Sequence, residues 1–160
     1  MMQPPYRTSG PRSAAPPDQP RAEPVERQQA ETAGQAGAGS GILIVEDDFL
    51  IAMQAEIALV DAGFSVVGVA AAADEALVLA RERRPAIAVV DIRVAGPRDG
   101  IDAAGDLFRE LGVRSVFATA HDDQQTRARA EPFAPLGWLT KPYTMASLIN
   151  VIRAALSKPN

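Results

Sequence analysis

Residues 42–48 read Ile-Leu-Ile-Val-Glu-Asp-Asp, a run of four aliphatic residues followed by three acids. A continuous, mostly β-branched run of this kind is typical of a strand buried on both faces, as in a parallel sheet. Two later runs have the same form: Ile87–Val90 ends at Asp91, and Ser115–Ala118 ends at Thr119. These stretches predict a parallel sheet whose strands end in polar side chains.

The rest of the chain alternates with these strands. Phe64–Val69 and Leu136–Leu139 predict two further strands, the last of them closed by Lys141-Pro142. Strands that alternate with helices imply right-handed crossovers and helices on both faces of the sheet. The predicted fold class is therefore α/β, a doubly wound five-stranded parallel sheet. The helices are predicted at residues 50–60, 74–83, 101–111, 122–130 and 145–156.

Three of these helices have clear limits in the sequence. In the first, Leu50, Met53, Ile57 and Val60 recur at helical spacing, and Gly63 is a typical C-terminal stop. Pro85 ends the second helix, because the residue before a proline is disfavoured in the helical conformation. Asp99 or Gly100 is expected near the N-cap of the third helix.

Composition excludes several classes of protein. The 160 residues contain no cysteine and one histidine, which excludes disulfides, thiolate metal sites and poly-histidine sites. The net charge of −4 argues against direct nucleic-acid binding. The sequence has no apolar run of about 18 residues and no secretory h-region. We expect a cytoplasmic protein that does not enter a membrane.

The first 40 residues differ from the remainder. They hold seven of the 13 prolines and few bulky apolar residues. Such a segment buries too little apolar surface to offset the entropy lost on ordering, so residues 1–40 are predicted to be a disordered tail. The tail could be a docking segment, a spacer or the product of a misassigned start. The folded domain is predicted at residues 41–160.

The predicted strand ends carry three acids, one hydroxyl group and one lysine. Glu46 and Asp47 follow the first strand, Asp91 ends the third, Thr119 ends the fourth and Lys141 follows the fifth. The carboxyl ends of parallel strands share one edge of a sheet, where ligands bind in open α/β folds. Carboxylates so close repel one another, and Mg²⁺ or Mn²⁺ would relieve this cost. A carboxylate can also attack phosphorus and form an acyl phosphate.

These motifs resemble the receiver domains of bacterial two-component response regulators. The resemblance rests on residues 42–48, Val89–Ile92, Thr119-Ala120 and Lys141-Pro142, and it covers about residues 41–156. It implies the flavodoxin-like receiver fold with strand order 2-1-3-4-5 and a cis bond before Pro142. Residues 117–120 also resemble a Phe-Ala-Thr-Gly pattern of stand-alone receivers from alphaproteobacterial stress and light signalling, although Ala120 replaces the glycine.

The resemblance also implies roles for single residues. Asp91 would be the phosphoacceptor, with Thr119 and Lys141 in contact with the phosphoryl group. Asp47 would be a direct Mg²⁺ ligand, and Asp91 would also belong to the metal site. The further metal contacts would be Glu46, acting mainly through water, and the backbone carbonyl of Arg93. Trp138 lies where the family has an aromatic switch residue, and packing alone is the other interpretation of this residue.

The loop after Asp91 departs from the family pattern. It is one residue longer than usual, and Ala95 stands where the family commonly has proline. Arg93 and His121 lie at positions that, in the family, flank the attacking water and tune dephosphorylation. Each could instead be a solvated loop residue.

The implied function is phosphorelay signal transduction. The protein would accept a phosphoryl group from a sensor histidine kinase or a histidine phosphotransfer protein, and would catalyse only its own phosphorylation and dephosphorylation. Because few residues follow Leu156, we expect a single-domain regulator that binds a downstream protein or acts as a phosphate sink, with homodimerisation left open. Alternatives are a degenerate receiver that binds partners without phosphorylation, a small aspartate-dependent hydrolase, and a flavin or nucleotide carrier.

Overall fold

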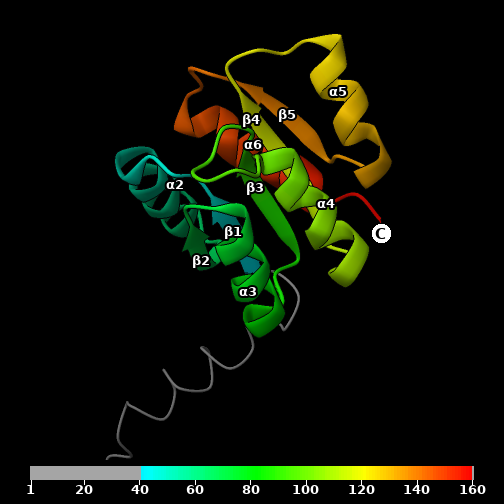
Figure 1. The fold of residues 1–160 in the computed structure, drawn as a ribbon. Helices are drawn as coiled ribbons and strands as arrows, with labels where there is room; N and C mark the ends of the chain where they lie inside the picture. The colour runs from blue at the N-terminus through cyan, green and yellow to red at the C-terminus, as the bar shows by residue number, and fades with distance from the viewer. Residues whose placement is uncertain (1–40, 160) are drawn as a thin grey trace, which may run out of the picture. The chain divides into compact units, whose positions relative to one another are not determined.

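The computed structural model describes residues 41–159, so the tail predicted for residues 1–40 lies outside the described residues. Figure 1 shows a parallel sheet with helices on both of its faces. The five strands are β1 (Gly41–Val45), β2 (Ser65–Ala70), β3 (Ile87–Asp91), β4 (Arg114–Thr119) and β5 (Gly137–Thr140). They lie in the order β2-β1-β3-β4-β5, all parallel, which confirms the predicted fold class and strand order.

The helices follow the strands as predicted, with small shifts at their ends. They are α2 (Phe49–Asp61), α3 (Ala73–Arg83), α4 (Gly100–Leu111), α5 (Gln124–Ala130) and α6 (Met145–Leu156). Helix α5 begins two residues later than predicted because Asp123 is its N-cap. A short 3-10 helix, η1 (Glu131–Phe133), follows it and was not predicted. Within residues 41–159, no helix is both long enough and apolar enough to span a bilayer.

Side chains of the central strands alternate between two hydrophobic cores, one on each face of the sheet. From β1, Ile42 and Ile44 belong to the cluster that includes Leu59 of α2 and Leu148 and Ile152 of α6. Leu43 and Val45 point to the opposite face, where the cluster includes residues of α3 and α4. Successive strand residues face opposite sides of a sheet, so a strand covered on both faces is apolar throughout. This arrangement explains why residues 42–45 read as a continuous aliphatic run.

Helix α2 packs on the sheet through a face that the sequence pattern did not indicate. Ala52, Ala55 and Leu59 are its buried residues. The larger apolar residues at helical spacing instead lie outside, with Leu50, Ile57 and Val60 between 53% and 62% exposed. Periodicity correctly predicted the helix but could not indicate that the smaller side chains would face the sheet.

The β3–α4 loop is held closely against the end of β3. Asp99 caps α4 in a reciprocal capping box with Asp102, as the expected cap position indicated. The next residue, Gly100, donates its amide to the carbonyl of Ile92 at 2.7 Å. A Cβ atom on Gly100 would lie 1.9 Å from the carbonyl oxygen of Asp91, so only glycine allows this approach.

Candidate functional site

The sheet register brings the predicted site residues to one edge. Val45 pairs with Val90, which places Glu46 beside Asp91 where β1 and β3 end. On the other side of β3, Asp91 pairs with Ala118, so Thr119 follows at the end of β4. An open cleft of about 770 Å³ lies at this edge. Seven of the eight predicted site residues line it: Glu46, Asp47, Asp91, Arg93, Thr119, His121 and Lys141.

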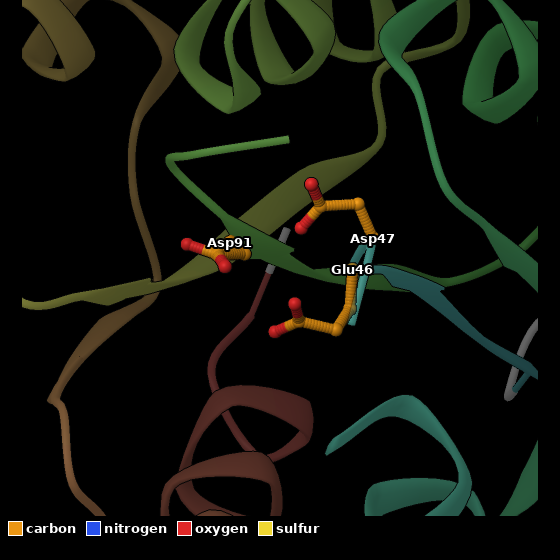
Figure 2. A group of neighbouring side chains, drawn as sticks. All are labelled: Glu46, Asp47 and Asp91. Atoms are coloured by element: carbon orange, nitrogen blue, oxygen red, sulfur yellow. The ribbon is translucent and has the colours of Figure 1, made fainter. Parts of the chain in front are cut away.

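Three acidic side chains form a compact group in this cleft. Figure 2 shows Glu46 and Asp47 just after β1, next to Asp91 on β3. Each offers a carboxylate oxygen within 4.8 Å of the others. Glu46 and Asp91 are buried, whereas Asp47 is exposed. Buried carboxylates at this separation require compensating positive charge, because like charges disfavour joint ionisation.

Lys141 supplies part of that compensation. Its ammonium donates to Asp91 Oδ2 at 2.6 Å and to Glu46 Oε2 at 3.1 Å. Burial alone would lower the pKa of Lys141, but its bonds to the two carboxylates outweigh burial and hold the pKa above its ordinary value. The cis bond between Lys141 and Pro142, implied by the family resemblance, is present. Lys141 therefore remains a cation between two buried acids.

The other carboxylate oxygens are held by backbone amides. Asp91 Oδ1 accepts from the amide of Arg93 at 3.0 Å, and Glu46 Oε1 accepts from the amide of Asp48 at 3.0 Å. Burial raises the pKa of Glu46; the Asp48 amide opposes this shift, and the charge of Asp91 adds to it. Asp48 is itself the N-cap of α2, accepting from the amides of Leu50 and Ile51. Both buried carboxyl groups are thus fixed in orientation.

Thr119 lies in the cleft but directs its hydroxyl to the following loop. The Oγ1 atom donates to the carbonyl of His121 at 2.9 Å and accepts from the amide of His121 at 3.1 Å. The hydroxyl is therefore occupied by backbone groups two residues away. The side chains of His121 and Arg93 are both exposed, and their tuning roles stay predictions, as does the ligand role of the Arg93 carbonyl.

Trp138 is the one predicted residue that does not line the cleft. Its ring stacks on Phe117 of β4, with centroids 5.0 Å apart and planes at 28°. The guanidinium of Arg127 lies over the ring, 4.7 Å from its centroid. Arg127 is in turn paired with Asp122 of the β4–α5 loop, at 2.5 Å and 2.6 Å. Trp138 therefore connects β5 to the loop that follows Thr119.

The sequence-based prediction missed the ion pairs that hold the cleft loops. Arg98 pairs with Asp106 of α4 and with Asp74 of α3, the latter at 3.0 Å. Arg129 of α5 pairs with Asp99 at 2.8 Å. The spacing of nearby residues can indicate a capping box, but it cannot indicate these ion pairs. The arginines pair with acids that are 8 to 30 residues away in the chain. Only the folded arrangement reveals them.

The group of acids fits a hard divalent cation. Mg²⁺ and Mn²⁺ prefer oxygen ligands and keep several waters, so they suit a site with few carboxylates open to solvent. Glu46, Asp47 and Asp91 provide such oxygens, and Asp47 lies at the exposed side of the group. The residues present therefore fit the ion that the sequence predicted.

Comparison with known proteins identifies relatives that match about three quarters of this chain. Among curated proteins, the chain is 38% identical over 117 residues to the phyllosphere-induced regulator PhyR of Methylorubrum extorquens, covering 72% of this chain and 43% of PhyR. It is 32% identical over 117 residues to the transcriptional regulatory protein PdtaR of Mycobacterium tuberculosis, covering 73% and 57%. The chain thus spans about half the length of these relatives.

Solved structures agree with this relationship. The signal receiver domain of a modulated diguanylate cyclase from Desulfovibrio desulfuricans matches with a TM-score of 0.67 and 37% identity, covering 72% of this chain and 92% of that one. The receiver domain of PhyR from Erythrobacter litoralis matches with a TM-score of 0.66 and 28% identity, covering 76% and 95%. The model of the response regulator receiver domain matches residues 42–153, which include every strand-end residue of the cleft. The chain therefore belongs to the receiver domain family of two-component response regulators.

Proposed function

We propose that this protein is a phosphorelay component that accepts a phosphoryl group on Asp91 from a phosphohistidine. The observation that carries the proposal is the setting of the Asp91 carboxylate. It is buried at the floor of an open cleft, fixed by the Arg93 amide and by Lys141, and adjacent to two further acids. A fixed carboxylate with a cation at hydrogen-bonding distance is suited to act as a nucleophile toward phosphorus.

Asp91, its two neighbouring acids and Lys141 have separate roles in the proposed phosphoryl transfer. An Asp91 oxygen forms the new bond to phosphorus while the bond to the donor imidazole nitrogen breaks, and the leaving imidazole retains the bonding electron pair. Glu46, Asp47 and Asp91 would hold Mg²⁺ or Mn²⁺, which neutralises charge on the phosphoryl oxygens when bound. Lys141 would move from the Asp91 carboxylate to a phosphoryl oxygen, since it already lies 2.6 Å from Oδ2.

We propose that Thr119 couples phosphorylation of Asp91 to a rearrangement of the loop that follows β4. Its hydroxyl is bonded to the backbone of His121, so contact with a phosphoryl group requires that these two bonds break. Their loss would free the β4–α5 loop, which carries Asp122 and, through it, Arg127 above Trp138. We propose that phosphorylation thereby shifts the population between two packings of this region.

The proposed partners follow from this chemistry. The phosphoryl donor is a sensor histidine kinase or a histidine phosphotransfer protein in the cytoplasm. The output is contact with a downstream protein, or withdrawal of phosphoryl groups from a shared relay. PdtaR is named a transcriptional regulatory protein and PhyR a phyllosphere-induced regulator.

The test is the intact mass of the full chain after incubation with Mg²⁺ and acetyl phosphate. We expect a gain of one phosphoryl group that is absent in EDTA and absent in Asp91→Asn. The matched control is Asp48→Asn, which changes another acid of the same cleft and keeps a residue that caps helices well. This variant should be phosphorylated normally.

A second measurement is needed because some receiver domains accept a phosphoryl group only from a kinase and not from acetyl phosphate. Beryllofluoride with Mg²⁺ mimics a phosphoryl group on a carboxylate, and Trp138 is the single tryptophan in the chain. A fluorescence change that requires Asp91 would support the proposal. Failure of both the mass gain and the fluorescence change would favour a degenerate receiver that binds partners without phosphorylation.

A further inference from the structure

The middle of the β3–α4 loop has no backbone contact that fixes it. Ala95 is held, because its amide donates at 3.2 Å to the carbonyl of the residue after β2, and Asp99 is held in the capping box of α4. Between them, the backbone of residues 96–98 makes no hydrogen bond to any part of the chain that the structure describes. A Cβ atom on Gly96 would meet no atom within 4 Å beyond its chain neighbours. Residues 96–98 are called here the loop wall.

The side chain of Arg98 makes the contacts that the backbone of the loop wall lacks. Its guanidinium pairs with Asp106 of α4 and, at 3.0 Å, with Asp74 of α3. The Asp106 side chain is only 18% exposed and also accepts from Arg109 at 3.2 Å, so it is a fixed partner. A guanidinium is planar and presents several donors in a fixed geometry, which lets one arginine join two helices. Arg98 therefore ties the loop wall to both α3 and α4.

The loop wall borders the cleft in which Asp91 lies. All three of its residues line the cleft together with Asp91. The Asp91 side chain is only 8% exposed, so water reaches its carboxylate through this cleft. The position of the loop wall therefore affects how freely water reaches any group that is attached to Asp91.

Arg98 is not suited to bind the phosphoryl group itself. Its guanidinium already faces two carboxylates, which balance its charge. Contact with a phosphoryl group would require Arg98 to leave both of them. Lys141, in contrast, bonds directly to the Asp91 carboxylate at 2.6 Å. The part that the geometry leaves for Arg98 is to fix the position of the loop wall.

We propose that Arg98 is a positioning residue, which holds the loop wall against α3 and α4 and thereby limits the access of water to the acyl phosphate. The inference rests on the proposed function of Asp91. In hydrolysis, a water oxygen bonds to phosphorus while the bond from phosphorus to the Asp91 oxygen breaks. The carboxylate keeps the bonding electron pair, one water proton is released to solvent, and inorganic phosphate leaves. Exclusion of water protects a reactive intermediate from this reaction, so a fixed loop wall lengthens the lifetime of the phosphorylated protein.

The test measures the lifetime of the phosphorylated full chain. The protein is phosphorylated with acetyl phosphate and Mg²⁺, separated from the donor, and followed by intact mass. We expect Arg98→Gln to lose the phosphoryl group about two- to fivefold faster, the factor by which a partly exposed ion pair shifts an equilibrium. Arg98→Lys should lie between the two, because an ammonium lacks the planar fork that joins both acids.

The matched control is Arg81→Gln. Arg81 pairs with Glu110 at 2.5 Å and so joins the same two helices, α3 and α4, but it does not line the cleft. This variant loses an ion pair of the same kind and should keep the lifetime of the unmodified protein. Urea denaturation of each variant checks that the fold is intact.

Two further measurements separate the position of the loop wall from the charge of Arg98. The double variant Arg98→Gln, Asp106→Asn keeps the net charge of the unmodified protein and should still lose the phosphoryl group faster. In the unphosphorylated protein, the NMR order parameter of the Gly96 amide should fall in Arg98→Gln and stay unchanged in Arg81→Gln. If acetyl phosphate does not phosphorylate the chain, the release rate of beryllofluoride replaces hydrolysis, because this mimic also leaves Asp91 through the cleft.

The inference is wrong if Arg98→Gln has the lifetime of the unmodified protein, or if Arg81→Gln shortens the lifetime as much. Recovery of the original lifetime in the double variant would also overturn it, by assigning the effect to charge. An unchanged Gly96 order parameter in Arg98→Gln would overturn it as well. If the unmodified chain neither gains a phosphoryl group nor responds to beryllofluoride, the proposed function fails and this inference fails with it. Phosphorylation of Asp91 with equal lifetimes in all variants overturns this inference alone.

Discussion

Lys141 is the residue on which the electrostatics of the cleft depend. Among the side chains of residues 41–159, it is the only one that bonds both buried acids, Asp91 and Glu46. The chain has two lysines and 14 arginines, and a lysine in a sequence that otherwise prefers arginine indicates that a compact point charge is needed here. The direction of the Thr119 hydroxyl could not be predicted in the same way, because rotation about a side-chain bond leaves no trace in a sequence pattern.

Replacement of Lys141 by glutamine should slow phosphorylation. The variant lacks the Lys141 ammonium, which is proposed to stabilise charge on the phosphoryl oxygens together with the metal ion, and the loss of one fixed electrostatic contact typically costs roughly a hundredfold in rate. The rate of mass gain with acetyl phosphate and Mg²⁺ measures the effect. Lys158→Gln is the control, since Lys158 donates to the carbonyl of Leu136 just before β5 begins. An unchanged rate in Lys141→Gln would remove this residue from the mechanism.

The start of α4 shows how one helix end positions the site. Its cap, Asp99, and its first residue, Gly100, follow directly from the loop that leaves Asp91. The sequence predicted this boundary because acids and glycine precede an apolar periodic segment. It did not predict which face of α2 would be buried, because helical periodicity alone does not determine which stripe faces the core.

Removal of the α4 cap should destabilise the domain. Asp99→Ala loses the capping bond to the Asp102 amide and the pair with Arg129, so we expect a loss of about 1 kcal/mol in the free energy of unfolding at neutral pH. Urea denaturation measures this. Glu82→Ala, at an exposed position of α3, should change stability by less than about 0.5 kcal/mol. Equal stability of the two variants would contradict the capping role.

The effect of the Asp99 variant should depend on pH in a defined direction. Burial raises the pKa of Asp99, but the bonds from Arg129 and from the Asp102 amide outweigh burial and hold the pKa below its ordinary value of about 3.9. A lowered pKa contributes stability above the ordinary value, and this contribution is lost as the pH falls through the folded-state pKa. The stability difference between Asp99→Ala and the unmodified protein should therefore shrink in acid. A difference that grows in acid would contradict this assignment.

Substitution of Gly100 should disturb both the fold and the site. In Gly100→Ala the new Cβ meets the carbonyl oxygen of Asp91, which is backbone and cannot rotate away. We expect a loss of about 1–3 kcal/mol in urea denaturation, the usual cost of overpacking, together with slower phosphorylation of Asp91. Gly68→Ala is the control, because its Cβ would meet the flexible end of Leu79 at 3.3 Å. A Gly100→Ala variant as stable as the control would show that the loop can move.

Across the whole molecule, the cleft and the α5 surface are joined by one series of contacts. Thr119 bonds to His121, the next residue Asp122 pairs with Arg127, and Arg127 lies on Trp138. The sheet topology and the convergence of the strand-end residues were predicted from the sequence. This series of contacts was not predicted, because Arg127 and Trp138 come together only through the pairing of β5 with β4 in the folded sheet.

The series predicts that Trp138 responds to the state of the cleft. Beryllofluoride with Mg²⁺ should change Trp138 fluorescence in the unmodified protein, because Thr119 leaves His121 to contact the phosphoryl mimic. In Thr119→Ala the change should be strongly reduced, although beryllofluoride still binds Asp91. Thr126→Ala is a suitable control, since within residues 41–159 its hydroxyl bonds only to Asp123, the N-cap of α5. A full response in Thr119→Ala would show that Trp138 is a packed aromatic and not a switch.

The most direct test of the account is to locate the acyl phosphate in the chain. Borohydride reduces an aspartyl phosphate to homoserine, and peptide mass spectrometry then identifies the residue that was modified. After incubation with Mg²⁺ and acetyl phosphate, we predict homoserine at position 91 in the peptide that contains β3, and none when EDTA is present. Homoserine at Asp47 or at another acid, with Asp91 unchanged, would contradict the central claim that Asp91 is the phosphoacceptor.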